Sequence, residues 1–472
     1  MCRREIAMLR KYIGTKEFYK MALLVAVPIM VQNGITNFVS MLDNIMVGRV
    51  GTEEMTGVAI VNQLIFVFNL CIFGAVSGAG IFGAQFYGKG DHEGLRCTFR
   101  YKILVCLALC VLGVAVFLGF GEPLIRLYLR GEGTPEEIAA SLSFARQYLR
   151  VMLVGFVPFA LVQCYSGTLR ETGETMLPMK AGIVSVLVNF VFNYLLIFGS
   201  FGAPKLGVVG AAIATVLARF AEAGIVIVWT HRHSERNRFI RGVYRSLAIP
   251  KKLFAQISRK GLPLLINETL WAGGMAMLMQ CYSIRGYNVI SAANIASTVG
   301  NVFNVAFLAM GNAVGILIGQ KLGAGELEEA RDWDRKLIAF SVTICLGIGA
   351  AMAALSPLFP LAYNTSHEIR HLATKMMIII ACCMPLHAFS NAAYFTIRSG
   401  GKTLITFFFD SFYMCVFAVP VIYLISRYTA MPITLLYLCA QLTEFGKCVV
   451  GFLLIRRGSW VKNIVTKEEV AV

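Results

Sequence analysis

The stretch GIFGAQFYGKG, residues 80–90, decides the architecture because a second copy of it occurs later in the chain. Residues 315–325 read GILIGQKLGAG, and a shift of 235 residues aligns the two copies without a gap. The same shift places Pro28 on Pro263, so the match extends toward the start of each half. The chain is therefore built from two sequence repeats.

The composition is that of an integral membrane protein. Only 15% of the 472 residues are charged, and the mean hydropathy is +0.69. A helix needs about 20 apolar residues to cross roughly 30 Å of hydrocarbon, and such windows recur along the whole chain. The sequence predicts an all-α polytopic protein in which Pro28 and Pro263 kink their helices. Its twelve transmembrane helices are expected at approximately 18–45, 55–86, 98–120, 142–167, 180–200, 207–230, 261–284, 290–318, 336–358, 374–396, 404–427 and 431–456.

The distribution of basic residues predicts the orientation. Six helices per half is an even number, so both repeats enter the membrane from the same side and are parallel. Most of the 43 Lys and Arg residues fall in the termini and in the loops after the even-numbered helices. Loops rich in Lys and Arg face the cytoplasm. We therefore expect a multi-pass protein of the plasma or inner membrane with both termini in the cytoplasm.

The longest basic run covers residues 231–260 and contains nine Lys and Arg residues. It has few aromatic side chains that could stack on bases, and it lies next to the membrane. These features favour a topogenic loop on the lipid headgroups over a nucleic-acid contact. The run divides the chain into an N-lobe, residues 1–230, and a C-lobe, residues 261–472. Parallel repeats of this kind predict a substrate cavity between the two lobes.

The sequence does not predict a nucleotide site. GGKT at residues 400–403 resembles the end of a P-loop, but Thr396 stands where that motif needs its first glycine. A strand should also precede a P-loop, and none is expected here. Transport without ATP must draw on an ion gradient.

Several ordered motifs carry a family resemblance that covers nearly the full chain. They are VPIMVQNGITNFVSMLDNIMVGRVG at 27–51, GAQFYGKGD at 83–91, TLRETGET at 168–175 and NFVFNYLLIFG at 189–199, with echoes in the second half. Together they resemble the multidrug and toxic compound extrusion (MATE) family. The resemblance implies a two-lobed antiporter, not an enzyme, that exports amphipathic, mostly cationic compounds in exchange for protons or sodium ions.

Ionisable residues at membrane depth are the site candidates, because placing one at the bilayer centre costs roughly 2.5–3.5 kcal/mol or more. Asp43 lies 15 residues after Pro28, and its counterpart in the second repeat is the neutral Leu278. The resemblance implies that an Asp at this distance is a proton-linked, substrate-coupling carboxylate; the alternative is an interfacial Asp that caps the next turn. Asn189 and Asn193 are one helical turn apart and face the same way, where some family members carry Asn and Asp.

The second half offers two further carboxylates. Glu268 follows Pro263 by five residues, and its counterpart is the neutral Asn33. The resemblance implies that a glutamate in this helix helps to bind the coupling cation. Asp410 is its natural partner, because carboxylates together with neutral oxygens suit a hard cation such as Na⁺. Some relatives carry a further Asp after the RGG-like turn, whereas this chain has Lys402 at that position. The coupling ion therefore stays open between H⁺ and Na⁺.

Polar side chains among Phe and Met are expected to line the export cavity, since 33 Phe and 20 Met make adaptable walls. The candidates are Gln32, Asn37 and Gln63. We expect organic cations as substrates, membrane lipids around a monomer, and no cofactor other than the coupling ion. Neither ATP nor nucleic acid is an expected partner.

The stretch HEIRH, residues 367–371, matches the zinc-protease signature HExxH. Its position at the external start of a helix predicts instead that Ser366 caps the helix and that Glu368 favours its positive end. None of the other His residues is placed to supply a third ligand, so no metal site is expected. Two alternatives to the antiporter remain. A flippase for lipid-linked saccharides predicts an Arg-rich central cavity, and an intramembrane zinc protease predicts bound metal.

Overall fold

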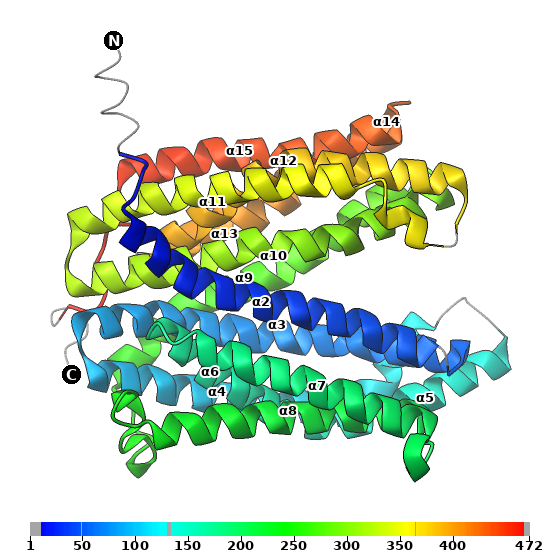
Figure 1. The fold of residues 1–472 in the computed structure, drawn as a ribbon, viewed down its shortest axis with the longest axis horizontal. Coiled ribbons are helices and arrows are strands. Elements are labelled where there is room, and N and C mark those ends of the chain that lie inside the picture. The colour runs from blue at the N-terminus through cyan, green and yellow to red at the C-terminus, as the bar shows by residue number, and fades with distance from the viewer. Residues whose placement is uncertain (1–10, 49, 130–133, 364, 467–472) are drawn as a thin grey trace. The chain divides into compact units, whose positions relative to one another are not determined.

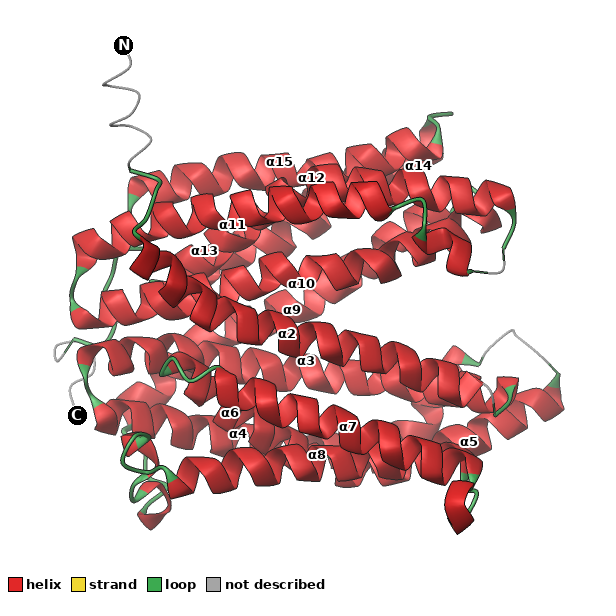
Figure 2. Cartoon of the chain, in the orientation of Figure 1, coloured by secondary structure: helices red, strands yellow, loops and turns green. Residues whose placement is uncertain are grey.

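A computed structural model describes residues 11–48, 50–129, 134–363 and 365–466. Helices make up most of these ranges, and no strand occurs in them (Figure 1, Figure 2). The prediction of an all-α protein is confirmed. The main helices are α2 Lys16–Gly48, α3 Thr52–Lys89, α4 His92–Tyr128, α5 Pro135–Val154, α6 Phe156–Glu171, α7 Met176–Phe198, α8 Gly207–Arg232, α9 Lys251–Ser283, α10 Tyr287–Ala324, α11 Leu327–Leu355, α12 His367–Ser399, α13 Thr403–Phe407, α14 Val419–Tyr428 and α15 Ile433–Arg457.

The described residues contain 11 spans that are long and apolar enough to cross a membrane, and up to 12 when α5 and α6 count as one bent span. These spans coincide with the predicted windows. The helices α2 and α9 continue through Pro28 and Pro263, so neither proline ends its helix. Kinks at the two prolines stay a prediction.

The fourth span departs from a straight helix, since α5 and α6 meet at Gly155 with a bend of 46°. Pro158 has no N–H, so the Val154 carbonyl loses its usual partner four residues on. Arg219 on α8 donates from Nη1 to the Gly155 carbonyl at 3.2 Å. The sequence contained the proline, but it did not show that the helix would bend this sharply.

The eleventh span, Thr403–Tyr428, contains two segments wound as π-helix between α13 and α14. They are η5, Phe408–Phe412, and η6, Met414–Ala418. Such turns are rare and occur frequently at functional sites, because the wider turn redirects a side chain. Asp410, one of the predicted carboxylates, lies in η5.

One compact unit comprises Val31–Gly83 and His92–Phe254. In this unit α8 packs against α5, α6 and α7, and α4 packs against α6 (Figure 1). A buried ion pair joins α4 to α6, with Lys102 Nζ 2.6 Å and 2.7 Å from the two carboxylate oxygens of Glu171. Gly83 makes room for it, since a Cβ there would lie 2.0 Å from Glu171 Oε2.

Part of the basic run at 231–260 packs against α4 in the same unit. Arg100 donates from Nε to the Val243 carbonyl at 2.9 Å and from Nη2 to the Gly242 carbonyl at 3.3 Å. Phe239 is buried, and its ring packs against that of Phe99 at an interplanar angle of 59°. The sequence interpretation, a loop on the headgroups, did not foresee this packing.

The other compact unit comprises the described parts of Met1–Met30, Ala84–Asp91 and Ala255–Val472. Its central helix is α12, which packs against α10, α11 and α15 (Figure 1). The start of α2 and the end of α3 belong to this unit, so the two units interleave along the chain. The lobes inferred from the repeat boundaries stay a prediction.

Residues 84–90 of the first copy contact the second copy inside this unit. A Cβ on Gly88 would lie 1.9 Å from the Gln320 carbonyl oxygen, and a Cβ on Gly323 would lie 1.9 Å from the Gln85 carbonyl oxygen. Each glycine therefore contacts the backbone of the other copy's glutamine. Only glycine permits so close an approach of two helices, which explains why the glycines recur at this spacing.

Candidate functional site: a carboxylate and amide network

The structure brings three predicted site residues of the first half together. Asn193 on α7 donates from Nδ2 to Asp43 Oδ1 on α2 at 2.6 Å, and to Asn189 Oδ1 at 3.1 Å. Asn189 donates from Nδ2 to Thr215 Oγ1 on α8 at 3.3 Å. All four residues lie in the unit that contains Val31–Gly83 and His92–Phe254. Three helices thus contribute to one polar network with a carboxylate at its end.

The Asp43 carboxylate accepts a hydrogen bond from an amide and is not paired with a cation among the described residues. Asn193 is 1% exposed and Asn189 is 5% exposed, whereas the Asp43 side chain is half-buried. In the described part of the chain no ion pair involves Asp43, and the buried Asn193 Oδ1 atom has no hydrogen-bond partner. A carboxylate with one neutral donor has spare capacity for a proton or a cationic group.

The other polar candidates of the first half lie outside this network. Gln32 accepts at Oε1 a hydrogen bond from Arg170 Nη2 at 2.5 Å, which ties α2 to the end of α6. Asn37 and Gln63 are exposed on α2 and α3. Thr215 was not predicted from the sequence. The only indication of it was a hydroxyl side chain within an apolar helix.

A second polar cluster forms in the unit that contains Ala255–Val472. Asp410 pairs through Oδ1 with Lys447 Nζ on α15 at 3.0 Å, and accepts at Oδ2 from Asn267 Nδ2 on α9 at 3.0 Å. Lys447 also pairs with Glu444 Oε1 at 3.0 Å. Glu268 is half-buried and follows Asn267 directly in the sequence of α9.

This cluster differs from the arrangement expected from the sequence. Asp410 was expected to share a cation with Glu268, but its two oxygens contact Lys447 and Asn267. Lys447, whose i,i+3 spacing from Glu444 predicts a structural ion pair, and Asn267 are the residues that sequence reasoning did not place beside Asp410. Asn267 immediately precedes Glu268, and Lys447 is a lysine within an apolar window; both facts were visible signals. A cation-binding role for Glu268 and Asp410 stays a prediction.

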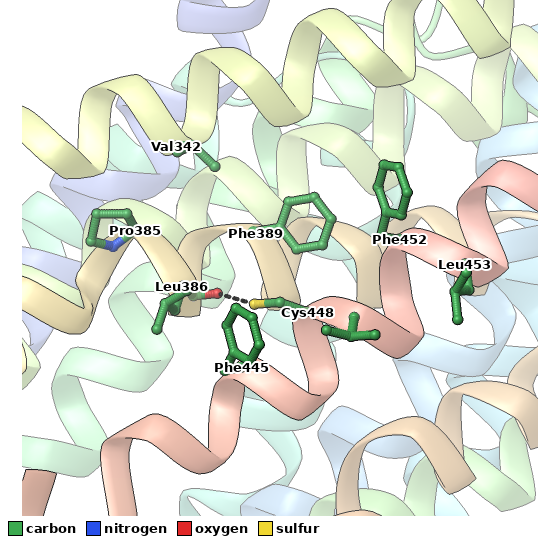
Figure 3. Close-up of a pocket in the computed structure, with 9 residues that line it drawn as sticks. Val342, Pro385, Leu386, Phe389, Phe445, Cys448, Phe452 and Leu453 are labelled. Atoms are coloured by element: carbon green, nitrogen blue, oxygen red, sulfur yellow. Dashed lines mark hydrogen bonds between the residues drawn. The ribbon is translucent and has the colours of Figure 1, made fainter. Parts of the chain in front are cut away.

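One surface pocket in the described residues is apolar. It measures about 420 Å³ and lies among α11, α12 and α15 (Figure 3). Phe389, Phe445 and Phe452 surround it, and Cys448 Sγ contacts the Leu386 carbonyl beside it (Figure 3). It offers no charge to a cationic ligand, so it does not define the site.

The HEIRH stretch opens α12, as predicted. Ser366 is the N-cap residue, its Oγ accepts from the Ile369 amide at 3.4 Å, and Glu368 lies in the first turn. His367, Glu368 and His371 are all exposed. Within the described ranges, no group of three or more His, Cys, Asp or Glu side chains could hold a metal ion.

Replacing His367, Glu368 and His371 together with Ala should leave transport near the wild-type level. Exposed substitutions of this kind usually change stability by no more than about 0.5 kcal/mol. Metal analysis of the purified triple variant and of the wild type should give the same zinc content, well below one ion per chain. Complete loss of transport by a normally folded triple variant would restore the metal hypothesis.

The two repeats, the apolar spans and the carboxylates within them define a helical membrane transporter. The MatE family profile matches residues 28–195 and 263–424, one segment in each repeat. The chain belongs to the MatE family, the multidrug and toxic compound extrusion transporters.

Known relatives agree with this family. The chain is 26% identical over 420 residues to the probable multidrug resistance protein YoeA of Bacillus subtilis, covering 87% of each chain. It is also 26% identical over 463 residues to the probable multidrug resistance protein NorM of Thermotoga maritima, covering 96% of this chain and 95% of that one. A solved outward-facing structure of a multidrug resistance MATE family transporter superimposes with a TM-score of 0.85 at 20% identity, over 96% of this chain and 98% of that chain. The chain is therefore a multi-pass transporter of the multidrug efflux class.

Proposed function

We propose that this transporter is a secondary antiporter that exports amphipathic, mostly cationic compounds in exchange for protons. The observation that carries the proposal is the setting of Asp43. It is a carboxylate held by the Asn193 amide, with no cation paired to it among the described residues. Asp410, in contrast, is already paired with Lys447. Of these two carboxylates, Asp43 is the one that remains available to exchange a proton for a cationic substrate.

In the proposed cycle, deprotonated Asp43 attracts a cationic substrate when the site faces the cytoplasm. Protonation from the outside neutralises Asp43 and releases the substrate. One proton entering down about 100 mV and one pH unit supplies roughly 2.3 + 1.4 kcal/mol, enough for a concentration ratio on the order of 500 for a neutral substrate. The ratio falls when the substrate itself carries positive charge outward.

We infer the cellular setting from the basic loops and from the relatives. The basic loops support a plasma or inner membrane location with both termini in the cytoplasm. The designation of the relatives as probable multidrug resistance proteins supports drug-like substrates. We further propose that the transporter works as a monomer without ATP or another cofactor, and that its lobes, residues 1–230 and 261–472, rock about the cavity.

The proposal is tested with inverted membrane vesicles and a fluorescent organic cation. An imposed pH gradient, acidic inside, should drive uptake of the cation into vesicles that contain the protein. An equal Na⁺ gradient at constant pH should not drive uptake. Uptake driven by the Na⁺ gradient alone would show that the coupling ion is Na⁺ and not H⁺. Cation uptake under neither gradient, with movement of lipid-linked saccharides across the bilayer, would favour the flippase instead.

A further inference from the structure

Lys447 on α15 is buried between two carboxylates. Its Nζ atom lies 3.0 Å from Asp410 Oδ1 and 3.0 Å from Glu444 Oε1, and its side chain is 7% exposed. The two remaining carboxylate oxygens are also occupied. Asn267 Nδ2 donates to Asp410 Oδ2 at 3.0 Å, and Ser390 Oγ donates to Glu444 Oε2 at 2.9 Å. Of these four contacts with carboxylate oxygens, the two that Lys447 makes are the charged ones.

The backbone around Asp410 is fixed to the neighbouring helix. Ser411 donates from its amide to Asn267 Oδ1 at 3.3 Å and from Oγ to the Asn267 carbonyl at 2.6 Å. Ser411 and Asn267 are both buried, at 0% and 1% exposure. These bonds hold the π-helical segment η5 against α9 and set the direction of the Asp410 carboxylate. The cluster is therefore a built site and not a chance meeting of surface charges.

We propose that Lys447 acts as a tethered cation that fills the carboxylate site of the second half and excludes Na⁺ from it. Lys447 is then a determinant of ion specificity, and it makes this half of the transporter independent of sodium. This inference excludes Na⁺ binding at the carboxylates of the second half as the coupling step. Its consequence for transport rests on the proposed antiport function. The occupancy of the site can be measured without any transport.

The physical reason is competition between a free and an attached cation. A lysine ammonium is monovalent like Na⁺, and its covalent attachment gives it a high effective concentration at Asp410 and Glu444. Na⁺ could enter only by expelling Lys447, which would leave an unpaired ammonium in a region of low dielectric constant. Without the lysine, two carboxylate oxygens, Asp410 Oδ1 and Glu444 Oε1, become free to bind a hard cation.

The test is Na⁺ binding to purified protein, measured with radiolabelled Na⁺ and as the change in melting temperature between NaCl and choline chloride at equal ionic strength. The wild type should show no specific response to Na⁺. Lys447→Met, which keeps the length of the side chain, should bind Na⁺ at least about tenfold more tightly than the wild type. The response should disappear in the double variant Lys447→Met, Asp410→Asn. Lys447→Arg, the matched control that keeps the charge, should behave as the wild type.

Two results would overturn the inference. One is a folded Lys447→Met variant that binds Na⁺ no better than the wild type. The other is a Na⁺ response of the wild type that Asp410→Asn removes, and this measurement remains decisive if Lys447→Met does not fold. Failure of proton-driven uptake in vesicles would contradict the proposed function and leave the binding result untouched, so the two failures are distinguishable.

Discussion

Asp43→Asn should abolish proton-driven efflux of organic cations while the protein remains folded and inserted. Asn is nearly isosteric with Asp, its side-chain oxygen can still accept the bond from Asn193 Nδ2, and a neutral amide is cheaper to bury in a membrane. The variant mimics a permanently protonated site, so it neither attracts the cation nor exchanges a proton. The expected loss is the full gradient-driven accumulation of the cation, a ratio of about 10 for one pH unit, because exchanging one monovalent cation for one proton moves no net charge.

The measurement is dye uptake into inverted vesicles, together with drug resistance of cells at equal membrane abundance of the protein. Glu368→Gln is the matched control, because it removes a carboxylate charge from an exposed position at the start of α12. It should transport as the wild type does. Efflux at the wild-type level by Asp43→Asn would move the coupling role to Glu268 and Asp410, whose neutral substitutions should then be tested.

Lys102→Met should destabilise the protein by about 3–5 kcal/mol, since it leaves the Glu171 carboxylate buried without the ammonium that contacts both of its oxygens. Lys102 is 0% exposed, and its ammonium contacts both oxygens of Glu171 and, at 2.9 Å, Thr168 Oγ1. The double variant Lys102→Met, Glu171→Met should recover much of the loss, because an apolar pair leaves no charge without a partner. Thermal unfolding of the detergent-purified variants measures both effects.

A surface pair provides the control for this prediction. Arg126 and Glu122 are one turn apart on α4, 2.8 Å from each other, and partly exposed. Arg126→Ala should cost no more than about 0.5 kcal/mol. Lys102→Met with the unfolding temperature of the wild type would show that Glu171 is neutral or otherwise compensated in the native protein.

The helices could be predicted from the sequence because the bilayer imposes a length and a composition on every span. The local departures from regular helix could not. The bend at Gly155 depends on Pro158 and on how α6 packs, and the π-helical turn at Asp410 is accompanied by a hydrogen bond from the Ser411 amide to Asn267 on another helix. Hydropathy does not encode contacts of this kind.

The site could be predicted where one physical rule was sufficient. A carboxylate at membrane depth is costly, so Asp43 was identified, and helical periodicity placed Asn189 and Asn193 on one face. No such rule predicts which side chains on different helices contact each other. Lys447 meets Asp410 from 37 residues away, and the rotation of each helix about its axis, which decides such pairs, is set by packing that one sequence does not reveal.

The same limit applied to Gln32. It was expected to line the cavity, yet it accepts a hydrogen bond from Arg170, 138 residues away. A polar side chain inside a span indicates a partner or a ligand, but it does not say which. The alternatives are separated only by the three-dimensional structure.

The most direct test of proton coupling through Asp43 is substrate-induced proton movement in proteoliposomes that contain a trapped pH-sensitive dye. With no initial pH gradient, an outward gradient of an organic cation should draw protons into the liposomes through the wild-type protein, because each substrate that leaves is exchanged for a proton. The Asp43→Asn variant, reconstituted at the same density, should give no such signal above protein-free liposomes. A proton signal of wild-type size from Asp43→Asn, or none from a wild type that still exports the cation, would contradict the account.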